Sequence, residues 1–162
     1  MKIGVVKEIK DKENRIALTP EGAKKLADSG NTVFVEENAG VNSGFSDEEY
    51  KNSGAEIVDT EKAWSADMII KVKEPLEKEY KFLREDQIVF TYFHLSGVTK
   101  TLTEALVSNK TTAVAYETVE NESRKLPLLA PMSAVAGNMS VTIGSYYLAK
   151  FNNGKGMQLG SV

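Results

Sequence analysis

Three cationic side chains follow strand-like segments, and they are the residues of this sequence best placed to do chemistry. Arg15 lies in a polar loop after the first apolar run, Lys73 directly follows the apolar run at 68–72, and His94, the only histidine, follows the run at 88–93. In parallel α/β sheets, ligands bind beyond the carboxyl ends of the strands. Guanidinium and ammonium groups suit a carboxylate, and an imidazole can give or take a proton near neutral pH. The three residues therefore predict a small pocket for an anionic ligand, with an acid/base group in it.

Each of the three residues also has a purely structural interpretation. Arg15 could be a solvated arginine in the charged loop 10–15, and Lys73 could pair with the adjacent Glu74. A lone histidine such as His94 is more often structural or simply exposed than catalytic. The residues alone leave both interpretations open.

The segments around these residues alternate between short apolar runs and stretches that begin with helix-capping residues. Several apolar runs are continuous, as in strands covered on both faces. The pattern predicts an α/β fold, a Rossmann-like parallel sheet flanked by helices. The expected strands are 3–6, 32–35, 55–58, 68–72, 88–93 and 112–116. The expected helix starts are Thr19 with Pro20, Ser46 with Glu49 as a capping box, Thr60, Pro75, and Thr99 or Thr101.

The pattern changes after Pro127. Pro131 begins a long segment, to about Lys150, that reads as one helix and is followed by no strand-like run. We therefore expect a domain boundary after residue 128. Residues 129–162 are expected to form a long helix and then a loop that leads onward.

The composition excludes several kinds of function. The chain has 162 residues, no cysteine and a net charge of -3. Disulfides, thiolate nucleophiles and zinc–cysteine sites are excluded, and a nucleic acid is not an expected partner. No apolar stretch approaches the roughly 20 residues of a membrane span, and the N-terminus has no apolar signal-peptide core. A cytoplasmic protein is the simplest expectation.

Sequence motifs for other chemistries are also missing. The nearest approach to a dinucleotide-binding fingerprint is Gly154-x-Gly156-x-x-x-Gly160, in which the third glycine comes one place late and no strand precedes the first. The chain has no phosphate-binding P-loop, no His-Glu-x-x-His motif and no Gly-x-Ser-x-Gly elbow. No metal site is expected.

Six further segments are distinctive when they are taken in series. They are NRIALTP at 14–20, SGFSD at 43–47, IKVKEP at 70–75, FTYFHL at 90–95, AYETV at 115–119 and LPLLAPMS at 126–133. Together they resemble bacterial alanine dehydrogenases, in the order in which that family has them. They span essentially the whole chain, and six in series are far more specific than any one alone. Related transhydrogenases and saccharopine-type dehydrogenases share the first segment but not the strand ending in Tyr92-Phe93-His94-Leu95.

The resemblance implies NAD-dependent interconversion of L-alanine with pyruvate and ammonia. By position in the family's motifs, Arg15 and Lys73 match the residues that hold the substrate carboxylate. His94 matches the general acid/base, whose proton would neutralise oxygen on the substrate carbon as hydride moves to or from the cofactor.

The resemblance also suggests supporting roles and shows departures from the family. Ser133 matches a serine that touches NAD, and Glu8 and Tyr92 match residues that support the substrate site. The family usually has an acidic and a basic residue where this chain has Ala134 and Asn138. Those changes lie on the cofactor side, whereas the substrate-side residues are intact.

The resemblance implies that residues 1–128 are the family's substrate domain and that residues 129–162 are a linker helix and the start of its NAD-binding domain. The rest of that domain, with its glycine fingerprint and a catalytic aspartate, has no counterpart in these residues. Because hydride transfer requires two reactants held in register, we expect the chain to be inactive alone. One alternative is a split enzyme, with a separate chain carrying the NAD-binding half. The other is a non-catalytic module that binds a 2-oxo acid or only oligomerises. Because the family forms homo-oligomers, the resemblance implies a homo-oligomer in each case.

Overall fold

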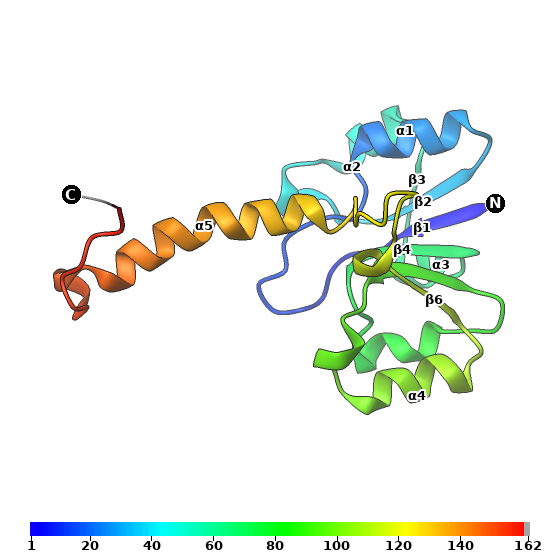
Figure 1. The fold of residues 1–162 in the computed structure, drawn as a ribbon. Helices are drawn as coiled ribbons and strands as arrows, with labels where there is room; N and C mark the ends of the chain where they lie inside the picture. Colours follow the sequence, from blue (N-terminus) through cyan, green and yellow to red (C-terminus); the bar gives the residue numbers. More distant parts are fainter. Residues whose placement is uncertain (161–162) are drawn as a thin grey trace. The chain divides into compact units, whose positions relative to one another are not determined.

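The computed structural model describes residues 1–160, so the last two residues of the expected segment 129–162 lie outside it. The chain divides into two compact units, Met1–Tyr116 and the part from Glu117 onward. The first unit is built on a six-stranded parallel sheet in the order β3-β2-β1-β4-β5-β6 (Figure 1). The expected Rossmann-like fold is confirmed. Its strands are β1 (Lys2–Val5), β2 (Thr32–Glu36), β3 (Glu56–Val58), β4 (Met68–Lys73), β5 (Ile88–Tyr92) and β6 (Thr112–Ala115).

Helices cover both faces of this sheet. On one side, α1 contacts β2 and α2 contacts β3; on the other, α3 contacts β1 and β2, and α4 packs on the 3-10 helix η2. The α-helices are α1 (Pro20–Asp28), α2 (Asp47–Asn52), α3 (Thr60–Trp64), α4 (Lys100–Ser108) and α5 (Ala130–Leu148). The 3-10 helices are η1 (Val41–Ser43), η2 (Glu77–Phe82), η3 (Leu95–Gly97), η4 (Tyr116–Thr118) and η5 (Lys150–Asn152).

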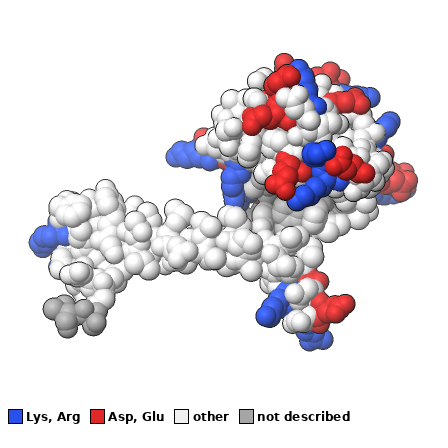
Figure 2. Space-filling view, turned by 90° about the horizontal axis from the view of Figure 1, so that it is seen from above, with Lys and Arg blue, Asp and Glu red and all other residues white. Residues whose placement is uncertain are grey.

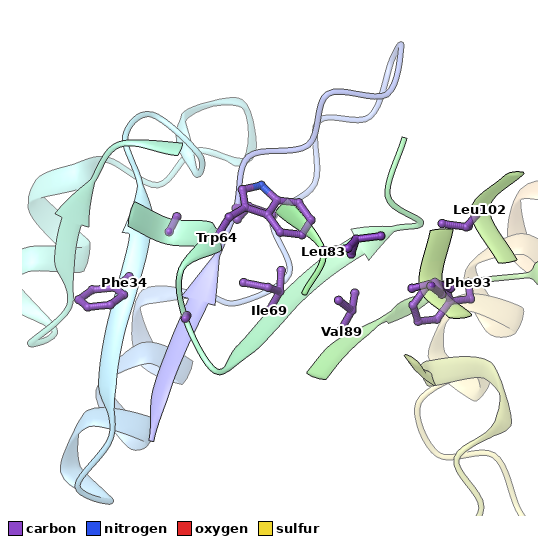
Figure 3. Packing of buried hydrophobic residues seen from close by; sticks show 11 residues of the cluster. Phe34, Trp64, Ile69, Leu83, Val89, Phe93 and Leu102 are labelled. Atoms are coloured by element: carbon purple, nitrogen blue, oxygen red, sulfur yellow. The ribbon is translucent and has the colours of Figure 1, made fainter. Parts of the chain in front are cut away.

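Successive side chains along a strand point to opposite faces of the sheet, so they pack into two separate hydrophobic cores. Val33 and Val35 of β2 face α1 and α2, while Phe34 between them joins the core on the opposite face. That second core is centred on the buried Trp64, with Ile69 of β4 close by (Figure 3). Because the central strands β1, β2 and β4 bury both of their faces, their apolar runs are continuous and could be recognised from the sequence.

Most of the expected helix starts are confirmed. The Thr19 hydroxyl accepts from the Gly22 N–H, and Ser46 with Glu49 forms the full capping box of α2. Thr60 is wrong as a cap, because the carboxylate of Asp59 accepts the Lys62 N–H and Thr60 is the first helical residue.

The start expected at Pro75 leads into a 3-10 helix, η2, instead of an α-helix. This short helix begins two residues after Pro75, at Glu77. Thr99 precedes α4, in agreement with the first of the two expected alternatives.

The second unit contains one long helix, α5, where the sequence predicts it. Its 19 residues carry no charged side chain, and Figure 2 shows only white atoms along it. Large apolar side chains stand exposed on it, among them Val141 and Tyr147. No helix among residues 1–160 is both long enough and apolar enough to cross a membrane.

Candidate functional site

The expected site residues follow three neighbouring strands at the carboxyl edge of the sheet. The strand order reverses between β1 and β4, with later strands running outward on one side and β2 and β3 on the other. Arg15 lies in the loop after β1, Lys73 ends β4, and His94 follows β5. Such a reversal leaves a crevice beyond the strand ends, which is where open α/β sheets bind ligands.

Arg15 is held in place by a neighbouring carboxylate. Its Nε lies 2.7 Å from Oε1 of Glu13 and its Nη2 lies 2.6 Å from Oε2, a two-pronged contact that fixes the plane of the guanidinium. The hydrogen bond from Arg15 lowers the pKa of the Glu13 carboxyl, and the charge of Lys73 acts in the same direction. The Arg15 side chain keeps 43% of its surface exposed, so it combines a fixed orientation with access to a ligand.

Lys73 stands at an irregularity in the sheet. Between Ile70 and Lys73, β4 advances three residues while its partner β5 advances two, from Phe90 to Tyr92. The Lys73 backbone is held on both sides, because its N–H donates to Oε1 of Glu8 at 3.2 Å and its carbonyl accepts from the Thr91 hydroxyl at 2.9 Å. Bulges of this kind re-aim side chains next to binding sites.

The alternative pairing of Lys73 with Glu74 is not among the ion pairs of the described residues. Glu74 pairs with Lys10 from the loop after β1 instead. That contact ties the loop that carries Arg15 to the end of β4. The expected supporting role of Glu8 has a geometric basis as well, since its carboxylate also accepts the Val72 N–H at 2.6 Å.

His94 adopts a left-handed backbone conformation, with φ 44° and ψ 48°. This conformation turns the chain out of β5 and into η3. The imidazole packs over Gly97, where an added Cβ would lie 2.7 Å from Nε2, so the absence of a side chain there leaves room for the ring. His94 is exposed, as a group that exchanges a proton with a ligand must be.

Electrostatic coupling shows that most of these side chains lie near one another. The hydrogen bond to Glu13 raises the pKa of Arg15, and Glu8 and Tyr92 act on it in the same direction. Burial raises the pKa of Tyr116, whose ring meets that of Tyr92 edge-on at 4.8 Å. Ser133 belongs to the second unit, where it is exposed in the first turns of α5.

A cavity of about 640 Å³ lies beside this group of residues. Its lining includes Ile9, Pro75 and Leu102, together with Gly97, over which the His94 ring packs. Arg15, Lys73 and His94 are not among its lining residues within the described chain. The exposed edge at the strand ends, and not this cavity, is therefore the candidate site. No cluster of His, Asp and Glu among residues 1–160 could hold a metal ion.

Two buried charged residues, Lys71 and Glu79, contact or neighbour the expected Glu8 and were not predicted from the sequence. Lys71 of β4 is completely buried, and its ammonium lies 2.8 Å from Oε1 of Glu79 and 3.4 Å from Oε2 of Glu8. Burial raises the pKa of the Glu79 carboxyl in spite of the attraction of Lys71. A signal was present, because a lysine between Ile70 and Val72 interrupts an apolar strand and needs a buried partner.

Comparisons with known proteins point to one family. Residues 4–136 match the family described as "Alanine dehydrogenase/PNT, N-terminal domain". The chain is 55% identical to an alanine dehydrogenase of Staphylococcus epidermidis and 53% identical to "Alanine dehydrogenase 2" of Staphylococcus aureus. Each alignment covers the whole chain but only 44% of the relative, so the chain spans less than half the length of these relatives.

Solved structures give the same result. An L-alanine dehydrogenase structure superposes with a TM-score of 0.89 at 47% identity, covering the whole chain and 45% of that protein. A transhydrogenase from Sinorhizobium meliloti superposes with a TM-score of 0.71 at 30% identity, covering 76% of this chain and 36% of that one. Because the family model matches most of the chain and a relative 55% identical matches all of it, this chain belongs to the family of alanine dehydrogenase/PNT N-terminal domains.

Proposed function

We propose that this chain supplies the substrate-binding and acid/base part of an NAD-dependent alanine dehydrogenase. The reaction converts L-alanine, NAD and water into pyruvate, ammonium, NADH and a proton. The observation that carries the proposal is the placement of Arg15, Lys73 and His94 after three neighbouring strands at the sheet's switch point. The alanine dehydrogenases among the relatives support this choice of substrate.

Each cation has a separate task in this proposal. Arg15, oriented by Glu13, and Lys73, fixed by its backbone contacts, bind the carboxylate common to alanine and pyruvate. His94 exchanges a proton with the oxygen on the substrate's second carbon as hydride moves. Glu8 and Tyr92 support this site, Glu8 through the backbone of β4 and Tyr92 beside Lys73 in the sheet.

NAD, when bound, supplies the hydride acceptor. In this chain its contact is the exposed hydroxyl of Ser133, which lies in a helix free of charged side chains. A serine hydroxyl fits the amide and hydroxyl groups of a nicotinamide nucleotide, since it both donates and accepts hydrogen bonds. The substrate-side residues act on the carboxylate and on the proton, independently of this contact.

Binding of pyruvate tests the substrate half of the proposal. We expect the purified chain to bind pyruvate in a calorimetric or NMR titration, and Arg15→Ala and Lys73→Ala to weaken binding by about tenfold or more each. Lys24→Ala is the matched control, because Lys24 is an exposed lysine of α1 whose ion-pair partner is Asp28 of the same helix. Equal affinity in all four proteins would contradict the proposed carboxylate site.

Turnover tests the acid/base role and separates the alternatives. NADH absorbance is followed with pyruvate and ammonium in the presence of the purified chain or of its His94→Asn variant. We expect pyruvate binding without turnover from residues 1–162 alone. Turnover that disappears in the variant would support a split enzyme, with a co-purified chain carrying the nucleotide-binding half.

The proposal includes self-association and a cytoplasmic location. Exposed apolar side chains along α5, such as Met139 and Val141, offer a surface that a second copy could cover. NAD and the small 2-oxo and amino acids of the reaction are cytoplasmic metabolites. A non-catalytic module that only binds a 2-oxo acid shares the same site, and the turnover measurement distinguishes it from an enzyme.

A further inference from the structure

Lys71 joins two carboxylates at the centre of the first unit. Its ammonium lies 2.8 Å from Glu79 and 3.4 Å from Glu8, and it also stands over the Trp64 ring, 5.9 Å from the centroid. The three charged side chains are between 1% and 5% exposed. Glu8 comes from the loop after β1 and Glu79 from η2, so one ammonium connects three elements.

The second oxygen of each carboxylate holds the backbone of one short segment. Oε1 of Glu8 accepts the N–H groups of Val72 and Lys73, at 2.6 and 3.2 Å. Oε2 of Glu79 accepts the N–H of Leu76 at 2.8 Å. The two acceptors therefore anchor both ends of the segment that contains Lys73.

Stability alone does not account for this arrangement. Burying three charges costs several kcal/mol per ion before their attraction is counted, and apolar side chains of similar size are often at least as stabilising. A methionine at position 71 could fill the space beside Trp64. What an apolar residue could not do is hold the two carboxylates in register with the backbone N–H groups around Lys73.

We propose that Lys71 is a positioning residue for the substrate site. Through Glu8 and Glu79 it fixes the backbone of Lys73 and of Leu76, so that the Lys73 ammonium stands where a substrate carboxylate binds. This inference rests on the proposed function, which assigns Lys73 to the carboxylate. Lys71 itself touches no substrate.

Amide hydrogen exchange tests the structural half of this inference without reference to any ligand. In Lys71→Met we expect the amides of Val72, Lys73 and Leu76 to exchange roughly tenfold faster or more, because their acceptors lose the cation that holds them. Amides of the central strands, such as that of Val89, should keep their protection. Lys24→Met on exposed α1 makes the same chemical change and should alter none of them. Unchanged exchange at all three amides in Lys71→Met would overturn the inference.

Pyruvate titration of the same proteins tests the functional half. We expect affinity to fall by roughly fivefold or more in Lys71→Met and to be unchanged in Lys24→Met. Faster amide exchange with unchanged affinity would overturn the positioning role. If the unaltered chain binds no pyruvate, the proposed function is wrong, and so is the proposed role of Lys73. The exchange data still decide whether Lys71 anchors the segment.

A charge-balanced variant covers the case in which Lys71→Met does not fold. Lys71→Met combined with Glu79→Gln removes one positive and one negative charge, so no additional unpaired charge is left in the core. The same amide and affinity changes are expected from it. A lower midpoint of thermal unfolding with normal affinity below that temperature would show a merely stabilising role and would overturn the inference.

Discussion

In the proposed site, Arg15 combines a ligand-binding role with a structural contact to Glu13. Glu13 occupies two of its donors, which sets the orientation of the guanidinium and reduces the freedom that an incoming carboxylate must remove. The guanidinium is half-exposed, so this pair contributes modestly to stability. Its value lies in preorganisation of the site.

The Glu13–Arg15 pair predicts a pH dependence of stability. Because the folded-state pKa of Glu13 is lowered from its ordinary 4.5, the pair's contribution is fully present above that value. It is lost as the pH falls through the folded-state pKa. We expect Glu13→Gln to lower the free energy of unfolding by about 1 kcal/mol or less at pH 7, with the difference shrinking in acid. Chemical denaturation at several pH values measures this, and exposed Glu48→Gln controls for the change in net charge.

The backbone conformation of His94 predicts that substitutions there change stability, separately from any role in proton transfer. Its left-handed conformation is tolerated by asparagine and strained for a β-branched residue. We expect His94→Val to be about 1–2 kcal/mol less stable than His94→Asn in denaturant unfolding. The same two substitutions at the exposed Thr101 of α4 should differ little, because the helix propensities of valine and asparagine are similar. Equal stability of the two His94 variants would contradict the strain argument.

At the scale of elements, β1 and α3 approach each other closely at Gly4. A Cβ added to Gly4 would meet the carbonyl oxygen of Ala63 at less than contact distance, together with the Ala66 side chain. Only glycine allows the strand to pass this close to the helix. The spacing of β1 and α3 sets the position of the loop that follows β1, which carries Glu8 and Arg15.

Gly4→Ala is therefore expected to destabilise the first unit by about 1–3 kcal/mol, through overpacking. The matched control is Gly137→Ala in α5, where an added Cβ meets no described atom within 4 Å. That substitution should stabilise α5 by about 0.5–1 kcal/mol, because alanine favours a helix more than glycine does. Thermal unfolding of both variants tests these two expectations. Similar shifts of the unfolding midpoint in the two variants would refute the close-packing argument.

At the scale of the whole molecule, charge and apolar surface are segregated along the chain. Lysine, arginine, aspartate and glutamate cover the first unit, whereas α5 has none of them (Figure 2). A helix this apolar and this exposed is unfavourable in water, which supports the proposed contact with a second copy.

We expect sedimentation velocity to show concentration-dependent association of the chain. Charged substitutions at exposed positions of α5, Val141→Lys and Tyr147→Lys, should shift it toward the monomer. Val107→Lys on α4 is the control, because Val107 is at least as exposed as Val141 and Tyr147 but belongs to the first unit. A monomer at every concentration, or equal effects of all three substitutions, would count against association through α5.

The amino-acid sequence by itself determined the elements and their order. Six strands were predicted from apolar runs, and the caps at Thr19 and Ser46 from local hydrogen-bonding chemistry, because both signals depend on residues a few positions apart. The order of strands and loops was enough to bring Arg15, Lys73 and His94 to the same edge of the sheet. Thr60 was mistaken for a cap because Asp59, immediately before it, is an equally good one.

Only the tertiary structure decided which charges pair. Glu74 pairs with Lys10 although Lys73 is its neighbour in sequence, and Lys71 pairs with Glu8, more than 60 residues away. The register shift that places Lys73 beside Tyr92 likewise arises between two strands, not within one. The physical reason is that hydrophobic periodicity and helix-capping residues depend on local geometry. The partner of a buried charge, by contrast, is set by which distant elements the folded chain brings within hydrogen-bonding distance.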